Sequence, residues 1–83
     1  MLHLNNQIEL ELDNECSTLK LNYQPLTDHT LYDVCDVQGR ILKTGEITSN
    51  QTNVDLKGLD NDQYILLVLD GNRAYTRKIK LKE

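Results

Sequence analysis

The sequence contains no Phe and no Trp, and only 5% of its 83 residues are aromatic. Its hydrophobic core must therefore be built from Leu, Ile and Val, together with the four Tyr residues. A chain of this length buries only roughly 60–65% of the surface that its unfolded form exposes. We therefore predict a single domain over residues 1–83, without a cofactor-sized interior cavity.

Cysteine is scarce, and catalytic patterns are missing. Cys16 and Cys35 are too few for a disulfide scaffold and lack the spacing of a metal site. One bridge stays open as an alternative, if the fold brings their α-carbons to about 5.5 Å. Strand alternation predicts that Cys35 is partly exposed. Serine and histidine residues lack the partners of a nucleophile or a general base, so we expect no enzymatic activity, no cofactor and no metal.

Positive charge is nearly absent from the first half of the chain. Up to residue 36, Lys20 stands alone against seven acidic residues, which are Glu9, Glu11, Asp13, Glu15, Asp28, Asp33 and Asp36. The net charge of −4 argues against binding to nucleic acid or to an anionic membrane. The basic residues gather near the end: Arg73, Arg77, Lys78, Lys80 and Lys82. Either strands of opposite charge lie side by side, or the basic end binds a partner.

A long apolar segment is also lacking. Residues 1–6 carry no positively charged region and no apolar stretch, so we expect neither a signal peptide nor a membrane span in this chain. The localisation stays open. It would be cytoplasmic if Met1 starts the native protein, and secreted or at the cell surface if the chain is the tail of a larger one.

What the sequence does have is apolar–polar alternation with a period of two residues. Seven short strands are expected, over residues 8–13, 18–23, 30–37, 41–47, 54–56, 64–69 and 73–82, with residues 48–53 as a polar loop. Turn residues separate them at regular spacing. This pattern is typical of an all-β protein with an immunoglobulin-like antiparallel β-sandwich.

The strand at residues 64–69 is apolar on both faces, which is unusual in a small antiparallel sheet. One set of side chains should face the core: Tyr64, Leu66 and Val68. The other should face away: Ile65, Leu67 and Leu69. We expect a central strand whose second face is covered by a loop, a terminal strand or another subunit. One hypothesis is therefore a small intracellular immunoglobulin-like protein that acts by self-association, as a symmetric homodimer.

Two glycine turns lie between the most apolar segments. Gly39, followed by Arg40, supplies a positive φ angle, and Gly58-Leu59 turns the backbone toward Tyr64. Each turn lies inside a characteristic segment: residues 34–42 (VCDVQGRIL) contain Gly39, and residues 54–66 (VDLKGLDNDQYIL) contain Gly58. A third segment follows at residues 76–82 (TRKIKLK). Their order and spacing resemble the C-terminal sorting domains of the type IX secretion system of Bacteroidota, over about residues 31–83. The family's Pro-Asn-Pro opening has no counterpart here.

The resemblance implies a non-enzymatic recognition module that binds a protein of the secretion machinery, such as the translocon. Lys78, Lys80 and Lys82 are the expected contact, by strand addition at a sheet edge or by docking of a basic patch. An alternative role for these lysines is to keep a terminal edge strand from pairing with other chains.

Overall fold

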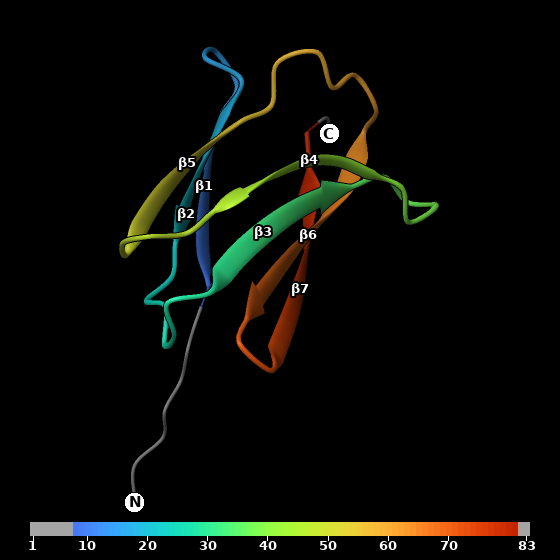
Figure 1. The fold of residues 1–83 in the computed structure, drawn as a ribbon. Helices are drawn as coiled ribbons and strands as arrows, with labels where there is room; N and C mark the ends of the chain where they lie inside the picture. The colour runs from blue at the N-terminus through green and yellow to red at the C-terminus, as the bar shows by residue number, and fades with distance from the viewer. Residues whose placement is uncertain (1–7, 82–83) are drawn as a thin grey trace, which may run out of the picture.

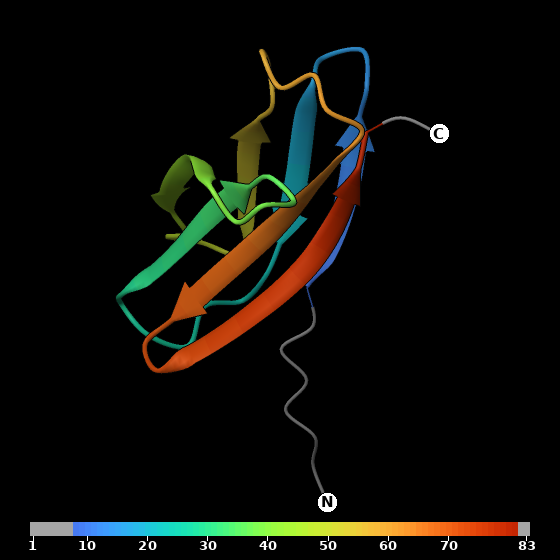
Figure 2. The same cartoon turned by 90° about the vertical axis from the view of Figure 1, so that its right-hand side faces the viewer.

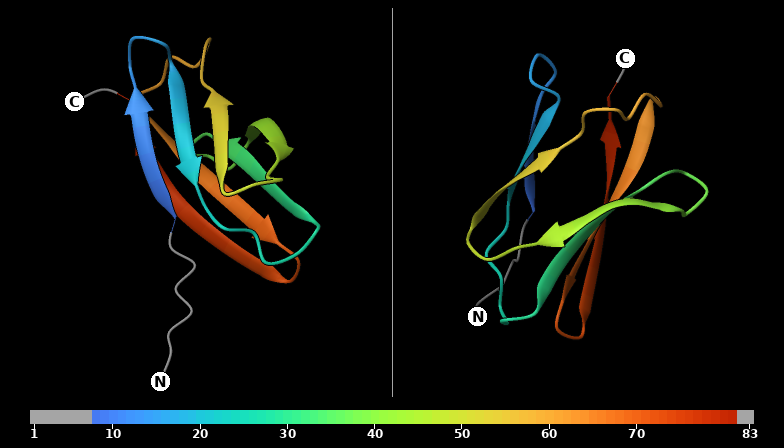
Figure 3. Two further views of the ribbon diagram at one scale, coloured as in Figure 1. Left: turned by 90° about the vertical axis from the view of Figure 1, so that its left-hand side faces the viewer. Right: turned by 45° about the horizontal axis from the view of Figure 1, so that its top comes forward.

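The computed structural model describes residues 8–81, which form seven antiparallel strands in two facing sheets (Figures 1 and 3). The strands are β1 (Glu9–Asp13), β2 (Thr18–Asn22), β3 (Thr30–Cys35), β4 (Ile41–Glu46), β5 (Gln51–Asp55), β6 (Gln63–Asp70) and β7 (Arg73–Lys80). One sheet has the order β1-β2-β5 and the other β4-β3-β6-β7. The predicted immunoglobulin-like sandwich is confirmed. No helix that could span a membrane occurs in the part of the chain that the structure describes.

The core lies between the sheets and consists of aliphatic and tyrosine side chains, as the composition requires. Its largest fully buried hydrophobic residues are Leu19, Leu21, Tyr23, Val34, Val54, Tyr64, Leu66 and Val68. The predicted orientation of β6 is confirmed. The inward side chains Tyr64, Leu66 and Val68 are at most 1% exposed, so the alternate residues of the strand point away from the core. β6 is also central, as predicted, between β3 and β7.

Two sequence-based interpretations of the strands are wrong. Residues 48–53 were expected to form a loop, but β5 begins at Gln51, because its backbone pairs with β2 while its polar side chains remain in solvent. One of the two alternatives for the charge distribution, that strands of opposite charge lie side by side, is not found either. The acidic β1 instead pairs with β2 in one sheet, and the basic β7 pairs with β6 in the other.

A glycine in β4 is explained by an aromatic neighbour. Gly45 pairs with Tyr32 of β3, and a β-carbon at residue 45 would lie 2.6 Å from the Tyr32 ring. The glycine leaves space for the ring to lie over the edge strand. β4 also contains a bulge near this glycine. Val34 pairs with Lys43 and Cys35 pairs with Ile41, so Leu42 has no partner residue on β3.

A buried carboxylate connects the two sheets. Asp70, at the end of β6, is 1% exposed and accepts five hydrogen bonds. Tyr23 Oη, just beyond β2 of the other sheet, donates at 2.5 Å. The amides of Leu26 and Thr27 donate at 2.8 and 3.0 Å, and the hydroxyls of Thr27 and Thr30 at 2.7 and 3.0 Å. The β2–β3 connection is thereby folded around one side chain.

These bonds decide the ionisation of Asp70. Burial acts to raise the pKa of the carboxyl, but the hydrogen bonds from Tyr23, Leu26, Thr27 and Thr30 outweigh it. The pKa of Asp70 consequently lies well below its usual range. Burial, and then the Asp70 charge, raise the pKa of Tyr23, so the phenol remains a hydrogen-bond donor.

The corner before β6 is held by Tyr64. Gly58, at a φ of +87°, closes a turn in which the Leu59 amide donates to Leu56 O at 3.1 Å. Leu59 packs against the core, as predicted. The Tyr64 ring is 1% exposed, and its hydroxyl accepts a 2.7 Å hydrogen bond from the Asn61 amide. This is the tyrosine corner typical of immunoglobulin-like sandwiches.

We expect Tyr64→Ala to lower the free energy of unfolding by about 3–5 kcal/mol, because it empties a fully buried site in a small core. Tyr64→Phe keeps the ring but leaves the Asn61 amide unpaired, so it should lower the free energy of unfolding by only about 1 kcal/mol. Urea unfolding followed by circular dichroism measures both. Equal losses for the two variants would show that the ring does not fill the core.

For Asp70→Asn we expect a loss of about 3 kcal/mol at neutral pH, because several donors lose a charged acceptor. The folded pKa of Asp70 is lowered, so its contribution is complete above the unfolded value of about 3.9 and is lost as the pH falls below it. The free energy of unfolding, measured between neutral and acidic pH, should fall more steeply for the native protein than for Asp70→Asn. Parallel curves would contradict this role.

Candidate partner-binding surface

The predicted apolar set of β6 lies on the outer face of the four-stranded sheet. Residues directly opposite in antiparallel strands point to the same side. Three rows of residues therefore cross β3, β6 and β7 on this face. They are Cys35–Ile65–Lys78, Asp33–Leu67–Thr76 and Leu31–Leu69–Ala74. We call these nine residues the outer face. Its three central residues from β6 are half-buried.

This face is turned toward the viewer in Figure 2, and the three-stranded sheet lies behind it. Leu31 on β3 is 41% exposed, and Ile41 on the neighbouring β4 is 62% exposed. Of the three coverings that the sequence left open, a terminal strand is not found within the described chain.

The prediction that Cys35 is partly exposed is wrong, because the residue is only 7% exposed. Although Cys35 points outward, β3 lies between two strands, and the larger Ile41 and Ile65 flank its small side chain. Burial, followed by the nearby Asp33 and Asp36, raises the pKa of its thiol. Cys16 is exposed in the β1–β2 turn, and both thiols are free.

Asp33 is the unusual member of the outer face. It is 8% exposed, between Leu31 and Cys35 on β3 and opposite Leu67 on β6. Within the described residues, its carboxylate takes part in no hydrogen bond or ion pair. Its carboxylate oxygens keep contact with solvent, since no side-chain oxygen that is fully buried in the described residues lacks a partner. The sequence did not single this residue out, because one acid in an alternating strand is indistinguishable from a solvated one.

The predicted lysines lie on the edge strand β7. Lys78 and Lys80 are exposed and point to the outer side, whereas Lys82 lies outside the described residues. Arg73 and Arg77 are on the opposite side of the same strand and are also exposed. β7 therefore carries four cations and no acidic side chain along one edge of the molecule.

Gly39 and Arg40 build the turn between β3 and β4. Gly39 has a φ of +90°, and its amide donates to Asp36 O at 3.0 Å. The Asp36 carboxylate accepts hydrogen bonds from the amides of Gln38 and Arg40, both at 2.9 Å, and from Arg40 Nε at 2.7 Å. The bond from the Arg40 amide is the main cause that lowers the pKa of Asp36. The predicted Gly39–Arg40 signature is therefore structural, and its organising residue is Asp36.

A comparison with protein-family models matches residues 5–82 to the family described as the secretion system C-terminal sorting domain. The chain belongs to this family. The match includes β1 and β2, which lie before the motifs that revealed the resemblance. The family is a type IX sorting-signal family and not a catalytic one. No curated protein matches the chain.

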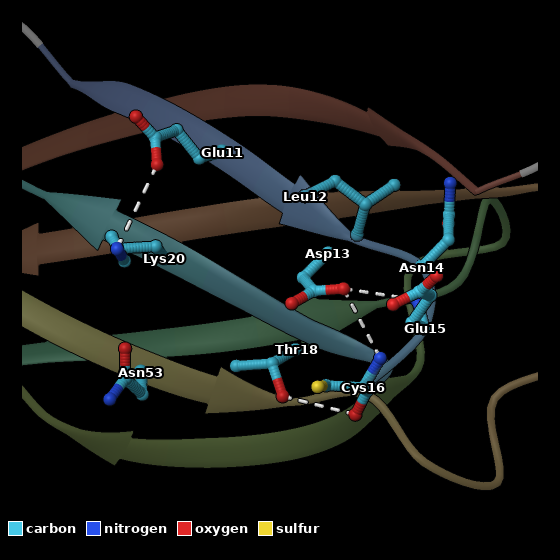
Figure 4. A pocket seen from close by; sticks show the side chains of 9 residues that line it. All are labelled: Glu11, Leu12, Asp13, Asn14, Glu15, Cys16, Thr18, Lys20 and Asn53. Carbon is cyan, nitrogen blue, oxygen red and sulfur yellow. Dashed lines mark hydrogen bonds and ion pairs between the residues drawn. The ribbon is translucent and has the colours of Figure 1, made fainter.

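The other sheet of the sorting domain has a shallow hollow beside the β1–β2 turn (Figure 4). Several of its polar groups interact with one another. Asp13 Oδ1 accepts the amides of Glu15 and Cys16 at 3.0 and 3.2 Å, and Glu11 lies 3.8 Å from Lys20 in an exposed ion pair. Within residues 8–81, no three His, Cys, Asp or Glu side chains are placed to hold a metal ion.

Thiol labelling should distinguish the two cysteines of the sorting domain. We expect iodoacetamide to modify Cys16 in the folded protein, because it is exposed, and to modify Cys35 only after unfolding, because it is buried. Mass spectrometry counts the labelled sites. Cys16→Ser should remove the rapid reaction, and rapid labelling of that variant would show that Cys35 is accessible.

Proposed function

We propose that this sorting domain is a recognition module that binds a protein of the secretion machinery along the free edge of β7. The observation that carries this proposal is the regularity of the strand. β7 pairs with β6 at eight consecutive positions without a bulge, and no described strand pairs with its other side. An unpaired strand edge of this kind offers backbone donors and acceptors to an extended segment of another protein.

The charge of β7 indicates the chemistry of the segment that would bind. Lys78 and Lys80 project to one side of the strand and Arg73 and Arg77 to the other. A strand added beside β7 would therefore meet cations on both of its faces, which favours acidic side chains. The domain as a whole is acidic, with a net charge of −4, so this edge differs from the remaining surface.

Export of a reporter tests this contact. The domain is fused to the C-terminus of a reporter with a signal peptide, in a bacterium that has a type IX system, and the reporter is measured in the medium. We expect Lys80→Glu combined with Arg77→Glu to reduce export by roughly tenfold, because like charges would meet at the interface. Both side chains are exposed, so the fold should persist.

The single substitutions Lys80→Glu and Lys57→Glu form a matched pair. Each reverses one exposed lysine, but Lys57 lies in the turn after β5, a strand of the other sheet. We expect only Lys80→Glu to reduce export. Equal export by both would refute the β7 contact. If the lysines only prevent wrong pairing, Lys80→Glu should be exported normally, because glutamate keeps a charge on the edge strand.

A further inference from the structure

The outer face of the four-stranded sheet combines apolar side chains with one carboxylate that no residue of the described chain pairs with. Ile65, Leu67 and Leu69 form its central line along β6, and Asp33 lies beside that line on β3. Lys78 lies on the far side, on β7. Figure 2 shows these three strands side by side, with β6 in the middle.

Asp33 and Lys78 cannot satisfy each other within one chain in this arrangement. They are separated by β6, which places them two strand spacings of about 4.8 Å apart and in adjacent rows. No ion pair joins them. The outer face thus has an acid on one side of an apolar line and a base on the other.

We propose that a second copy of the sorting domain covers this face, in a two-fold dimer whose axis runs along β6. Rotation about that axis places β6 on β6, so that Leu67 contacts Leu67 of the second copy. It also places β3 opposite β7 of the second copy. Asp33 then faces Thr76 of the second copy and lies one row from Lys78 of the second copy, and the symmetry repeats this arrangement on the other side of the axis.

The charges select this axis over the other one in the plane of the sheet. An axis across the strands at the Leu67 row would place β3 opposite β3 and bring the two Asp33 carboxylates together, which like-charge repulsion disfavours. With the axis along β6, Lys78 faces the row of Cys35, one row from Asp33. Facing sheets lie about 10 Å apart, and one row is about 6.8 Å along a strand, so a lysine side chain leaning along the strand can approach the carboxylate.

The same axis places apolar groups against apolar groups. Leu69 meets its own symmetry mate, and Leu31 of β3 faces Ala74 of the second copy. The free edge of β7 lies in the plane of the sheet and remains open in such a dimer. The dimer therefore concerns a different surface from the proposed secretion contact and does not rest on it.

Sedimentation velocity over a dilution series that reaches millimolar concentration tests the dimer. We expect the native domain to double its mass at high concentration. Asp33→Lys and Lys78→Asp should each weaken dimerisation by roughly tenfold or more, because each places two like-charge pairs in the interface. An equimolar mixture of these two variants should restore the dimer, since each of the two contacts then joins a lysine of one variant to an aspartate of the other. Lys57→Asp, far from the face, should dimerise like the native domain.

Circular dichroism and thermal melting confirm the fold of each variant. If Asp33→Lys does not fold, Leu67→Lys replaces it, because Leu67 is half-buried on the axis and would face a second lysine. A native domain that stays monomeric at the highest concentration overturns the proposal. So does a mixture of Asp33→Lys and Lys78→Asp that remains monomeric. Export of Asp33→Lys by the secretion system reports on the β7 contact separately.

Discussion

The fold depends on the hydrogen bonds that one buried carboxylate accepts where the two sheets meet. Asp70 ends β6 in the four-stranded sheet, and its shortest hydrogen bond comes from Tyr23, beside the three-stranded sheet. The backbone between β2 and β3 donates to the same side chain. Because an acceptor without donors would be costly at this depth, the two sheets and their connection are stable only together.

Three buried carboxylates in this small domain differ in what they do. Asp70 joins the sheets, and Asp36 organises the turn before Arg40. Both are supplied with donors by their own chain. Asp33 is somewhat more exposed, no described residue donates to it, and its carboxylate oxygens keep contact with solvent. The first two side chains therefore stabilise the fold, whereas the third distinguishes one face of the sheet as a surface suited to a cation from outside.

The surfaces of the domain are divided in a manner that suits a recognition signal. The three-stranded sheet presents a polar outer face whose charges are engaged locally, as between Glu11 and Lys20. The four-stranded sheet presents an apolar outer face, and β7 adds a long basic edge to it. Strand addition at the edge and sheet packing on the face use separate groups, the backbone in one case and side chains in the other.

The sequence by itself determined the seven strands, the inward side of β6 and the corner at Tyr64, because alternation and turn chemistry act over a few neighbouring residues. Its motifs also pointed to the sorting-domain family. Only the tertiary structure decided that Cys35 is buried and that the acidic β1 does not pair with β7. It also decided that Asp70 accepts hydrogen bonds from its own chain, whereas Asp33 accepts none from the described residues. Those outcomes depend on which strands become neighbours. A local pattern of apolar and polar residues carries no information about the residues that lie across a sheet or between two sheets.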